Sequence, residues 1–148
     1  MNTATSLERL AYLLEIIPPL LLKTDEKDFQ KKPAPNKWSK KEILGHLVDS
    51  AANNHQRFIR IQYENEPVIF YDQDKWNLLN HHQDLEKKQL VEFWRIYNTH
   101  LMHVASRITD ENLERKGIGN DGSPKTLAYY IEDYIVHLEH HLRQIISY

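Results

Sequence analysis

Apolar residues recur at three- and four-residue steps in four stretches of the chain, which is the spacing of amphipathic helices. These stretches cover residues 6–23, 40–63, 84–108 and the C-terminal part from about residue 124. No alternating strand pattern of comparable strength appears between them. The pattern therefore predicts an all-α protein, a four-helix bundle formed as a single domain by residues 1–148. In the third stretch, the side chains expected to face the core are Leu85, Leu90, Phe93, Tyr97, Leu101, Val104 and Ile108.

Local signals mark the starts of the first two helices. Ser6 is placed to cap the first one, and Pro18-Pro19 inside its pattern predicts a kink or a break. Ser39 and Glu42 have the spacing of a capping box, in which each side chain satisfies a free backbone N–H of the other residue. The second helix is therefore expected to begin directly after Ser39.

Three irregular stretches separate the helices. Residues 24–37 are polar and contain prolines, so they are interpreted as a linker. Residues 64–83 are rich in aromatic side chains, with room for one short helical turn, and loops of this length often cover a functional site. Residues 109–123 contain three of the four glycines and are expected to be a loop. The last helix then starts at Ser123-Pro124 or at Thr126.

Composition excludes several functions. Cysteine is absent, so the protein has no disulfide, no thiolate ligand and no cysteine nucleophile, and any thiol in its chemistry must be a small molecule. The net charge is −2 and no basic block stands out, which argues against nucleic acid as a partner. There is no apolar run long enough for a membrane span and no N-terminal leader pattern. We therefore expect a cytoplasmic protein that does not bind a membrane.

Nine histidines are unusual for a chain of 148 residues. His137 and His141 are four residues apart on the last helix, so their imidazoles can converge, as in half of a helical metal site. His46 lies at the edge of the apolar face of the second helix. Three neutral ligands with an open fourth position are typical of a catalytic metal site. Spacing alone does not bring His46 to the pair. These three residues can therefore also be ordinary core histidines with hydrogen-bond partners.

Other polar residues are candidates for the surroundings of such a site. Asp49 and Asp133 lie one turn from His46 and His137, where their carboxylates can orient the imidazole rings. His140 points away from the core and is a supporting or solvent-facing residue.

Four further residues are candidate substrate contacts. Asn53 and Arg57 lie on the same polar edge as His46 and can meet an anionic part of a substrate, although a solvated arginine is the ordinary alternative. Tyr71 and Trp76 can cover the site from the loop, although Trp76 can equally pin its loop to the bundle. Gly45 lies inside the second predicted helix, where glycine costs about 1 kcal/mol relative to alanine. Nothing in the sequence explains a glycine at this position. Surface or capping positions are expected for the remaining histidines, His55, His81, His82, His100 and His103.

Three motifs resemble the DinB/YfiT-like superfamily of four-helix-bundle metalloenzymes. They are WSKKEILGHLVDS over residues 38–50, Glu66-Pro67 followed by YDQDKW over residues 71–76, and HLEHHLRQI over residues 137–145. The middle motif is similar to the YfiT branch in particular. Because the motifs run from the second helix to the last, the resemblance covers essentially the whole chain.

The resemblance implies a divalent metal, zinc or nickel, held once per chain by His46, His137 and His141. It also implies either a hydrolase that activates water or an S-transferase that activates a low-molecular-weight thiol such as bacillithiol, mycothiol or glutathione. The expected partners are then the thiol, an electrophilic substrate and a second copy of the chain in a homodimer. A different class also stays open: the same bundle as a non-catalytic metal-binding or interaction module.

Overall fold

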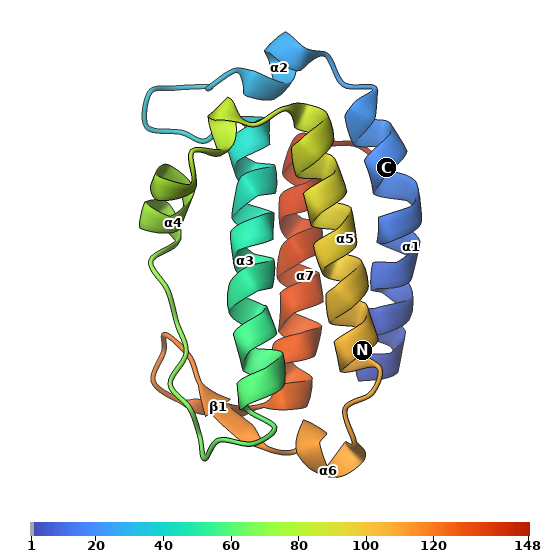
Figure 1. Cartoon of the computed structure of the whole chain (residues 1–148), viewed down its shortest axis with the longest axis vertical. Coiled ribbons are helices and arrows are strands. Elements are labelled where there is room, and N and C mark those ends of the chain that lie inside the picture. The colour runs from blue at the N-terminus through green and yellow to red at the C-terminus, as the bar shows by residue number, and fades with distance from the viewer. Residues whose placement is uncertain (1) are drawn as a thin grey trace.

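A computed structural model describes residues 2–148 and confirms the all-α bundle (Figure 1). Its four long helices are α1 (Thr3–Leu22), α3 (Lys40–Arg60), α5 (Lys87–Ala105) and α7 (Leu127–Ile145). The connections contain the short helices α2 (Glu26–Gln30), α4 (Gln73–Asn80) and α6 (Asp110–Leu113), and a turn of 3-10 helix, η1 (His82–Asp84). Two short antiparallel strands, β1 (Lys116–Ile118) and β2 (Pro124–Thr126), precede α7.

The order of the long helices around the bundle differs from their order in the chain. α1 packs against α5 and α7, and α3 packs against the same two helices, so α1 and α3 lie diagonally opposite each other. α1 and α7 run in one direction, whereas α3 and α5 run in the other (Figure 1). α3 and α7 are therefore antiparallel neighbours, and this places the beginning of α3 beside the end of α7.

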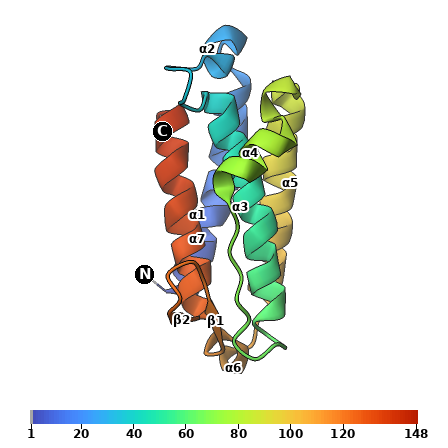
Figure 2. The same ribbon diagram turned by 90° about the vertical axis from the view of Figure 1, so that its left-hand side faces the viewer.

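α3 and α5 are neighbours that run in parallel, so the chain must return along the whole bundle between them. Residues 61–86 make this return: they pass along the outside of α3 as an extended segment and then form α4 and η1 (Figure 2). The long connection predicted over residues 64–83 was right in position. It was wrong in detail, because α4 has eight residues rather than a single turn.

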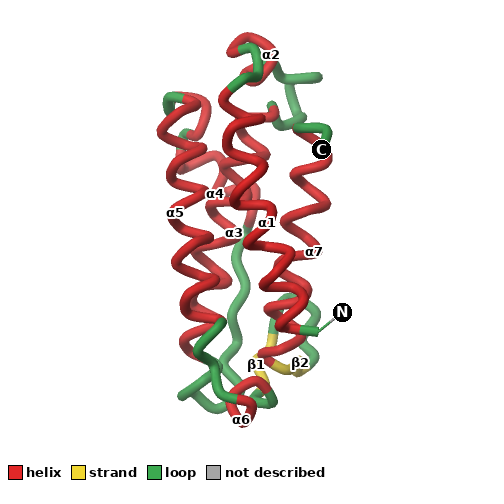
Figure 3. The backbone as a smooth tube through the Cα atoms, turned by 90° about the vertical axis from the view of Figure 1, so that its right-hand side faces the viewer, coloured by secondary structure: helices red, strands yellow, loops and turns green. Residues whose placement is uncertain are grey.

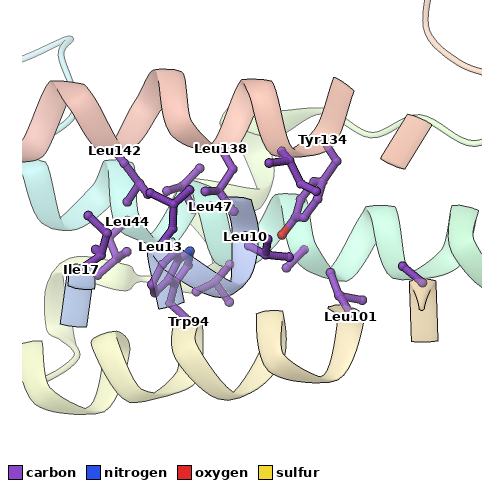
Figure 4. Close-up of a cluster of buried hydrophobic side chains, with 14 of the residues drawn as sticks. Leu10, Leu13, Ile17, Leu44, Leu47, Trp94, Leu101, Tyr134, Leu138 and Leu142 are labelled. Atoms are coloured by element: carbon purple, nitrogen blue, oxygen red, sulfur yellow. The ribbon is translucent and has the colours of Figure 1, made fainter. Parts of the chain in front are cut away.

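The core lies between the four long helices (Figure 4). Leu13 of α1, Leu44 of α3, Trp94 of α5 and Leu138 of α7 are all fully buried there. The predicted apolar face of α5 was partly wrong, because Phe93 is 46% exposed. The buried face of α5 instead consists of Leu90, Val91, Trp94, Asn98, Leu101 and Ala105.

A buried amide explains why the face of α5 was misplaced. Asn98 is fully buried and accepts a hydrogen bond from the Tyr134 hydroxyl at 2.6 Å, while its own amide donates to the Trp94 carbonyl at 2.9 Å. A polar residue with satisfied hydrogen bonds sits on the core side, and hydrophobicity alone assigns it to solvent.

The helix ends test the capping predictions. Ser39 and Glu42 form the predicted capping box at the start of α3, and Thr126 caps α7. The Ser6 prediction was wrong, because Asn2 caps α1 and the buried Ser6 lies inside the helix. The Pro18-Pro19 pair does not break α1, which continues to Leu22.

The predicted loops contain more structure than the sequence indicated. The linker over residues 24–37 contains α2, and the loop over residues 109–123 contains α6 and β1 (Figure 3). The extended return segment also joins the short sheet, since the Ile69 N–H donates to the Ile118 carbonyl at 2.9 Å. Among the described residues, no helix combines the length and the apolar character that crossing a membrane requires.

Candidate metal centre

Three histidines from two helices meet beside the bundle core. His46 comes from α3, and His137 and His141 come from successive turns of α7. One ring nitrogen of each lies within 4.8 Å of those of the other two. The ring centroids are 5.4 Å apart for His46 and His137, 4.7 Å for His46 and His141, and 4.5 Å within the α7 pair. The antiparallel contact of α3 with α7 therefore brings together residues that are about ninety positions apart in the sequence.

His46 is held in an environment that keeps it neutral. The residue is 1% exposed, and its ring lies against Trp38 with the centroids 5.0 Å apart. Burial, followed by the neighbouring His141 and His137, lowers the pKa of His46 to about 3. Neither of its ring nitrogens has a hydrogen-bond partner among the described residues. A buried imidazole with two unsatisfied nitrogens is unfavourable unless another group binds it.

The rings of His137 and His141, the pair on α7, are oriented so that one nitrogen of each faces the other. The Nδ1 atom of His141 lies 2.8 Å from Oε1 of Gln144 and donates its proton to that oxygen, so the lone pair of this ring is on Nε2. That Nε2 lies 3.1 Å from Nε2 of His137. Two nitrogens bound tetrahedrally to one zinc ion are about 3.3 Å apart. The sequence analysis named Asp133 for His137 and no acceptor for His141; Gln144 supplies that acceptor, one turn further along α7.

Asp49 does not orient His46, contrary to the expectation. Both oxygens of Asp49 lie 3.1 Å from Nε2 of His82, and Oδ1 also accepts from the Asn80 side chain at 2.8 Å. His82 is buried, so its assignment to a surface or capping position was also wrong. The residues just after α4 are thus attached to α3 one turn beyond His46.

Asp133 and His140 stay at the edge of the centre. Asp133 is exposed, and the described structure records no hydrogen bond from it to His137, although its charge partly offsets the lowering of the His137 pKa by burial and by His141. The exposed ring of His140 lies 5.3 Å from that of His141. Neither residue holds a ligand ring in place.

A cavity beside His137 contains two of the four predicted substrate contacts. Arg57 and Tyr71 line it, together with Asn54 rather than Asn53. The side chain of Asn53 is buried and donates to the Asp49 carbonyl of its own helix. Trp76 does not line this cavity; its ring packs edge-on against Tyr71 with the centroids 5.7 Å apart.

The other histidines lie away from the centre. His81 ends α4 in the left-handed conformation, as a capping position predicts, and His100 and His103 are exposed. His55 is half-buried, and its Nδ1 lies 3.0 Å from the Tyr97 hydroxyl.

The donor set fits a divalent metal. Three neutral imidazoles, one with two partnerless buried nitrogens and two with facing Nε2 atoms, are suitable ligands for zinc, nickel and similar ions. Only side chains supply these ligand atoms, and no fourth histidine, aspartate or glutamate completes the cluster among residues 2–148. Such an incomplete set leaves room for a water or a substrate atom.

Fold and site together define a four-helix bundle with a three-histidine centre between two of its helices. The chain belongs to the DinB superfamily, whose family model matches residues 5–145.

Two curated proteins are similar to this chain, and both are described as a "putative metal-dependent hydrolase". The one from Oceanobacillus iheyensis is 22% identical over 122 residues, covering 82% of this chain and 70% of the relative. The one from Halalkalibacterium halodurans is 27% identical over 127 residues, covering 85% of this chain and 74% of the relative.

Solved structures share the fold. YfiT from Bacillus subtilis, described as having "an unusual four-helix bundle topology", superimposes with a TM-score of 0.79 at 21% identity. That match covers 94% of this chain and 83% of YfiT. A mycothiol-dependent maleylpyruvate isomerase superimposes with a TM-score of 0.81 at 9% identity, over 99% of this chain and 62% of the isomerase.

Proposed function

We propose that this protein is a metal-dependent enzyme in which His46, His137 and His141 hold one divalent ion per chain, zinc or nickel. The observation that supports this most strongly is the pair of partnerless nitrogens on the buried His46, beside two histidines whose Nε2 atoms face each other. When bound, such an ion supplies a Lewis-acidic position that lowers the pKa of a coordinated water or thiol. The descriptions of the curated relatives support the same general activity.

Two reactions fit this centre. In an S-transferase, a small thiol loses its proton to water, its sulfur forms a bond to an electrophilic carbon, and the leaving group departs with its electron pair. In a hydrolase, water takes the place of the thiol. The protein has no cysteine, so the thiol of the first reaction is a cosubstrate. In both, Arg57 and Tyr71 are positioned to contact the substrate in the cavity beside His137.

The first test is the metal content of untagged protein, measured by plasma mass spectrometry. We expect about one zinc or nickel per chain, lost in His141→Ala and retained in the matched control His140→Ala, since the exposed His140 lies on the next position of the same helix. Loaded protein is then assayed for thiol conjugation and for ester or amide hydrolysis, with chelated protein as the blank. Metal binding without turnover of any substrate would favour the non-catalytic metal-binding module.

We also propose that the protein acts as a homodimer in the cytoplasm. Exposed apolar side chains on the outer face of α5 support a self-association surface: Phe93 is 46% exposed and Ile96 is 54% exposed. Sedimentation velocity tests this, with Ile96→Lys expected to sediment as a monomer and Lys88→Glu, on the same helix, as the control that keeps the dimer.

A further inference from the structure

Two cavities adjoin the three-histidine centre, one on each side along the bundle axis. The first has a volume of about 190 Å³ and includes His137; we call it the enclosed cavity because it is the smaller and less open of the two, although it also opens to solvent. The second has a volume of about 450 Å³ and includes His141, and we call it the open cavity. Gln73, at the start of α4, lines both of them. The centre therefore lies between two separate spaces rather than at the bottom of one.

The helix positions confirm that the two cavities extend in opposite directions. From α3, the enclosed cavity is lined by residues after His46, including Arg57, whereas the open cavity is lined by Ile43. On the antiparallel α7 the order is reversed, since residues before His141 line the enclosed cavity and Gln144 lines the open one. At 1.5 Å per residue, Ile43 and Arg57 are separated by about 20 Å along the helix.

Arg57 gives the enclosed cavity a positive charge that lacks a counter-charge. Its guanidinium donates to two neutral acceptors, the Asn54 side-chain oxygen at 3.1 Å and the Ile69 carbonyl at 2.9 Å. Its Nε atom is buried and has no partner, and within residues 2–148 no carboxylate lies within ion-pair distance of it. The guanidinium also lies over the Tyr130 ring, with its carbon 4.9 Å from the ring centroid, so all its contacts are to neutral groups. A half-buried cation without a carboxylate partner favours the binding of an anion.

Tyr71 adds a neutral donor to the same cavity. Burial is the main cause that raises the pKa of Tyr71 to about 12, so the phenol keeps its proton at neutral pH. Arginine and tyrosine N–H and O–H groups together match the oxygens of a carboxylate. Ligand cavities are commonly about 300–1,000 Å³, so a space of this smaller size admits only a short group.

The open cavity has a different character. It is lined by Lys37, Trp38 and Gln144 at the end of the bundle where α3 begins, and it is more than twice as large. It can hold the body of a second, bulkier molecule whose reactive atom reaches the histidines from the His141 side.

We propose that the two cavities are separate subsites of one centre: the enclosed cavity binds a short carboxylate-bearing electrophile through Arg57, and the open cavity takes the thiol. This inference rests on the proposed function and favours its two-substrate form, because a hydrolase needs one organic substrate and no second cavity.

Asp133 is the acidic side chain on the same cavity wall and provides the opposing argument. Its carboxylate is exposed and is screened by solvent, whereas Arg57 is half-buried. An anion inside the cavity is therefore attracted by Arg57 more than it is repelled by Asp133. A cationic substrate would bind only if the attraction of Asp133 exceeded the repulsion of Arg57. The experiment below distinguishes an anionic from a cationic ligand.

The experiment uses three probes of equal length that differ in charge: butyrate, butyramide and butylamine. Their binding to zinc-loaded protein is measured by calorimetry. We expect butyrate to bind at least tenfold more tightly than butyramide, since a hydrogen bond between two charged groups is stronger than one to a neutral amide. Arg57→Gln removes this preference, Arg57→Lys keeps part of it, and Asp133→Asn increases it. Arg57 also holds Ile69, so circular dichroism checks that each variant is folded; loss of structure alone does not change the ratio of the two affinities.

Simultaneous binding tests the second half of the proposal. 2-Mercaptoethanol is titrated into cobalt-substituted protein, and sulfur coordination is followed by absorption. We expect the affinity for butyrate to change less than twofold when the thiol is saturating. Strict competition between the two probes, or preferred binding of butylamine, would overturn the proposal of two subsites. No sulfur signal would instead contradict the thiol function and leave the preference for anions as a separate result.

Discussion

The ring of His82 packs directly on the backbone of Gly45, one residue before the proposed ligand His46. A Cβ atom on Gly45 would lie 2.2 Å from Cγ of His82, far inside van der Waals contact. The same ring is held from its other side by Asp49, both of whose oxygens lie 3.1 Å from its Nε2. A glycine inside a helix, unfavourable by itself, is thus required by the close approach of the return segment to α3.

Gly45→Ala is expected to destabilise the protein although alanine is the better helix former. The gain in helix propensity is about 1 kcal/mol, whereas forcing a methyl group into a packed contact commonly costs about 1–3 kcal/mol. Urea unfolding followed by circular dichroism measures the net loss. Combining it with His82→Ala, which opens the space, should recover most of the difference between glycine and alanine. A stabilised Gly45→Ala protein would contradict the contact.

Trp38 should report metal binding through its fluorescence. Its ring lies 5.0 Å from that of His46, whereas Trp94 is in the core and Trp76 is on α4. Nickel, which quenches nearby indoles, is expected to reduce the emission of the wild-type protein. Trp38→Phe should remove most of the nickel-dependent change, and Trp76→Phe should leave it in place. Equal quenching in all three proteins would place the ion elsewhere.

The metal-free protein should lose stability as the pH falls below the ordinary pKa of a histidine. The pKa of His46 is about 3 in the folded chain, against about 6.5 when unfolded, so the unfolded state binds more protons between these values. Stability contributed by the neutral His46 is fully present above about pH 6.5 and decreases toward about pH 3. At about pH 5 the expected loss from His46 is about 2 kcal/mol relative to neutral pH.

Urea unfolding in chelator at the two pH values measures this loss, with His46→Gln as the comparison because glutamine does not titrate. We expect a smaller pH dependence in the variant. An unchanged dependence would mean that other groups, such as His137, account for the acid sensitivity.

The sequence was sufficient for the bundle and for the His137–His141 pair, because both depend on short-range periodicity. The His137–His141 pair follows from helix geometry alone, and the capping box of Ser39 is a local pattern. That His46 meets the pair depends on the antiparallel contact of α3 with α7, which the resemblance implied and the residues alone did not.

The remaining features depend on contacts that spacing does not encode. Asp49 was assigned to His46 because it lies one turn away, but a residue from the return segment, His82, occupies its oxygens. Gln144 and Asn54 were missed for the same reason, since amides become candidates only when their neighbours are known. Residues 61–86 return along the bundle because α3 and α5 are parallel neighbours. This role of the segment becomes visible only once the arrangement of the helices is known.

Two serines provide a matched pair for the capping argument. The hydroxyl of Ser39 accepts from the Glu42 N–H at 3.0 Å and donates to the Gln83 side chain at 2.7 Å, whereas the hydroxyl of Ser6, buried inside α1, has no partner among the described residues. Ser39→Ala removes a cap and is expected to cost about 1–2 kcal/mol of unfolding free energy. Ser6→Ala removes an unsatisfied buried hydroxyl and favours the helix, so it should leave stability unchanged or raise it by up to about 1 kcal/mol. Urea unfolding of both variants beside the wild type measures the contrast, and equal losses would show that a partner for Ser6, such as a buried water, is needed to describe α1.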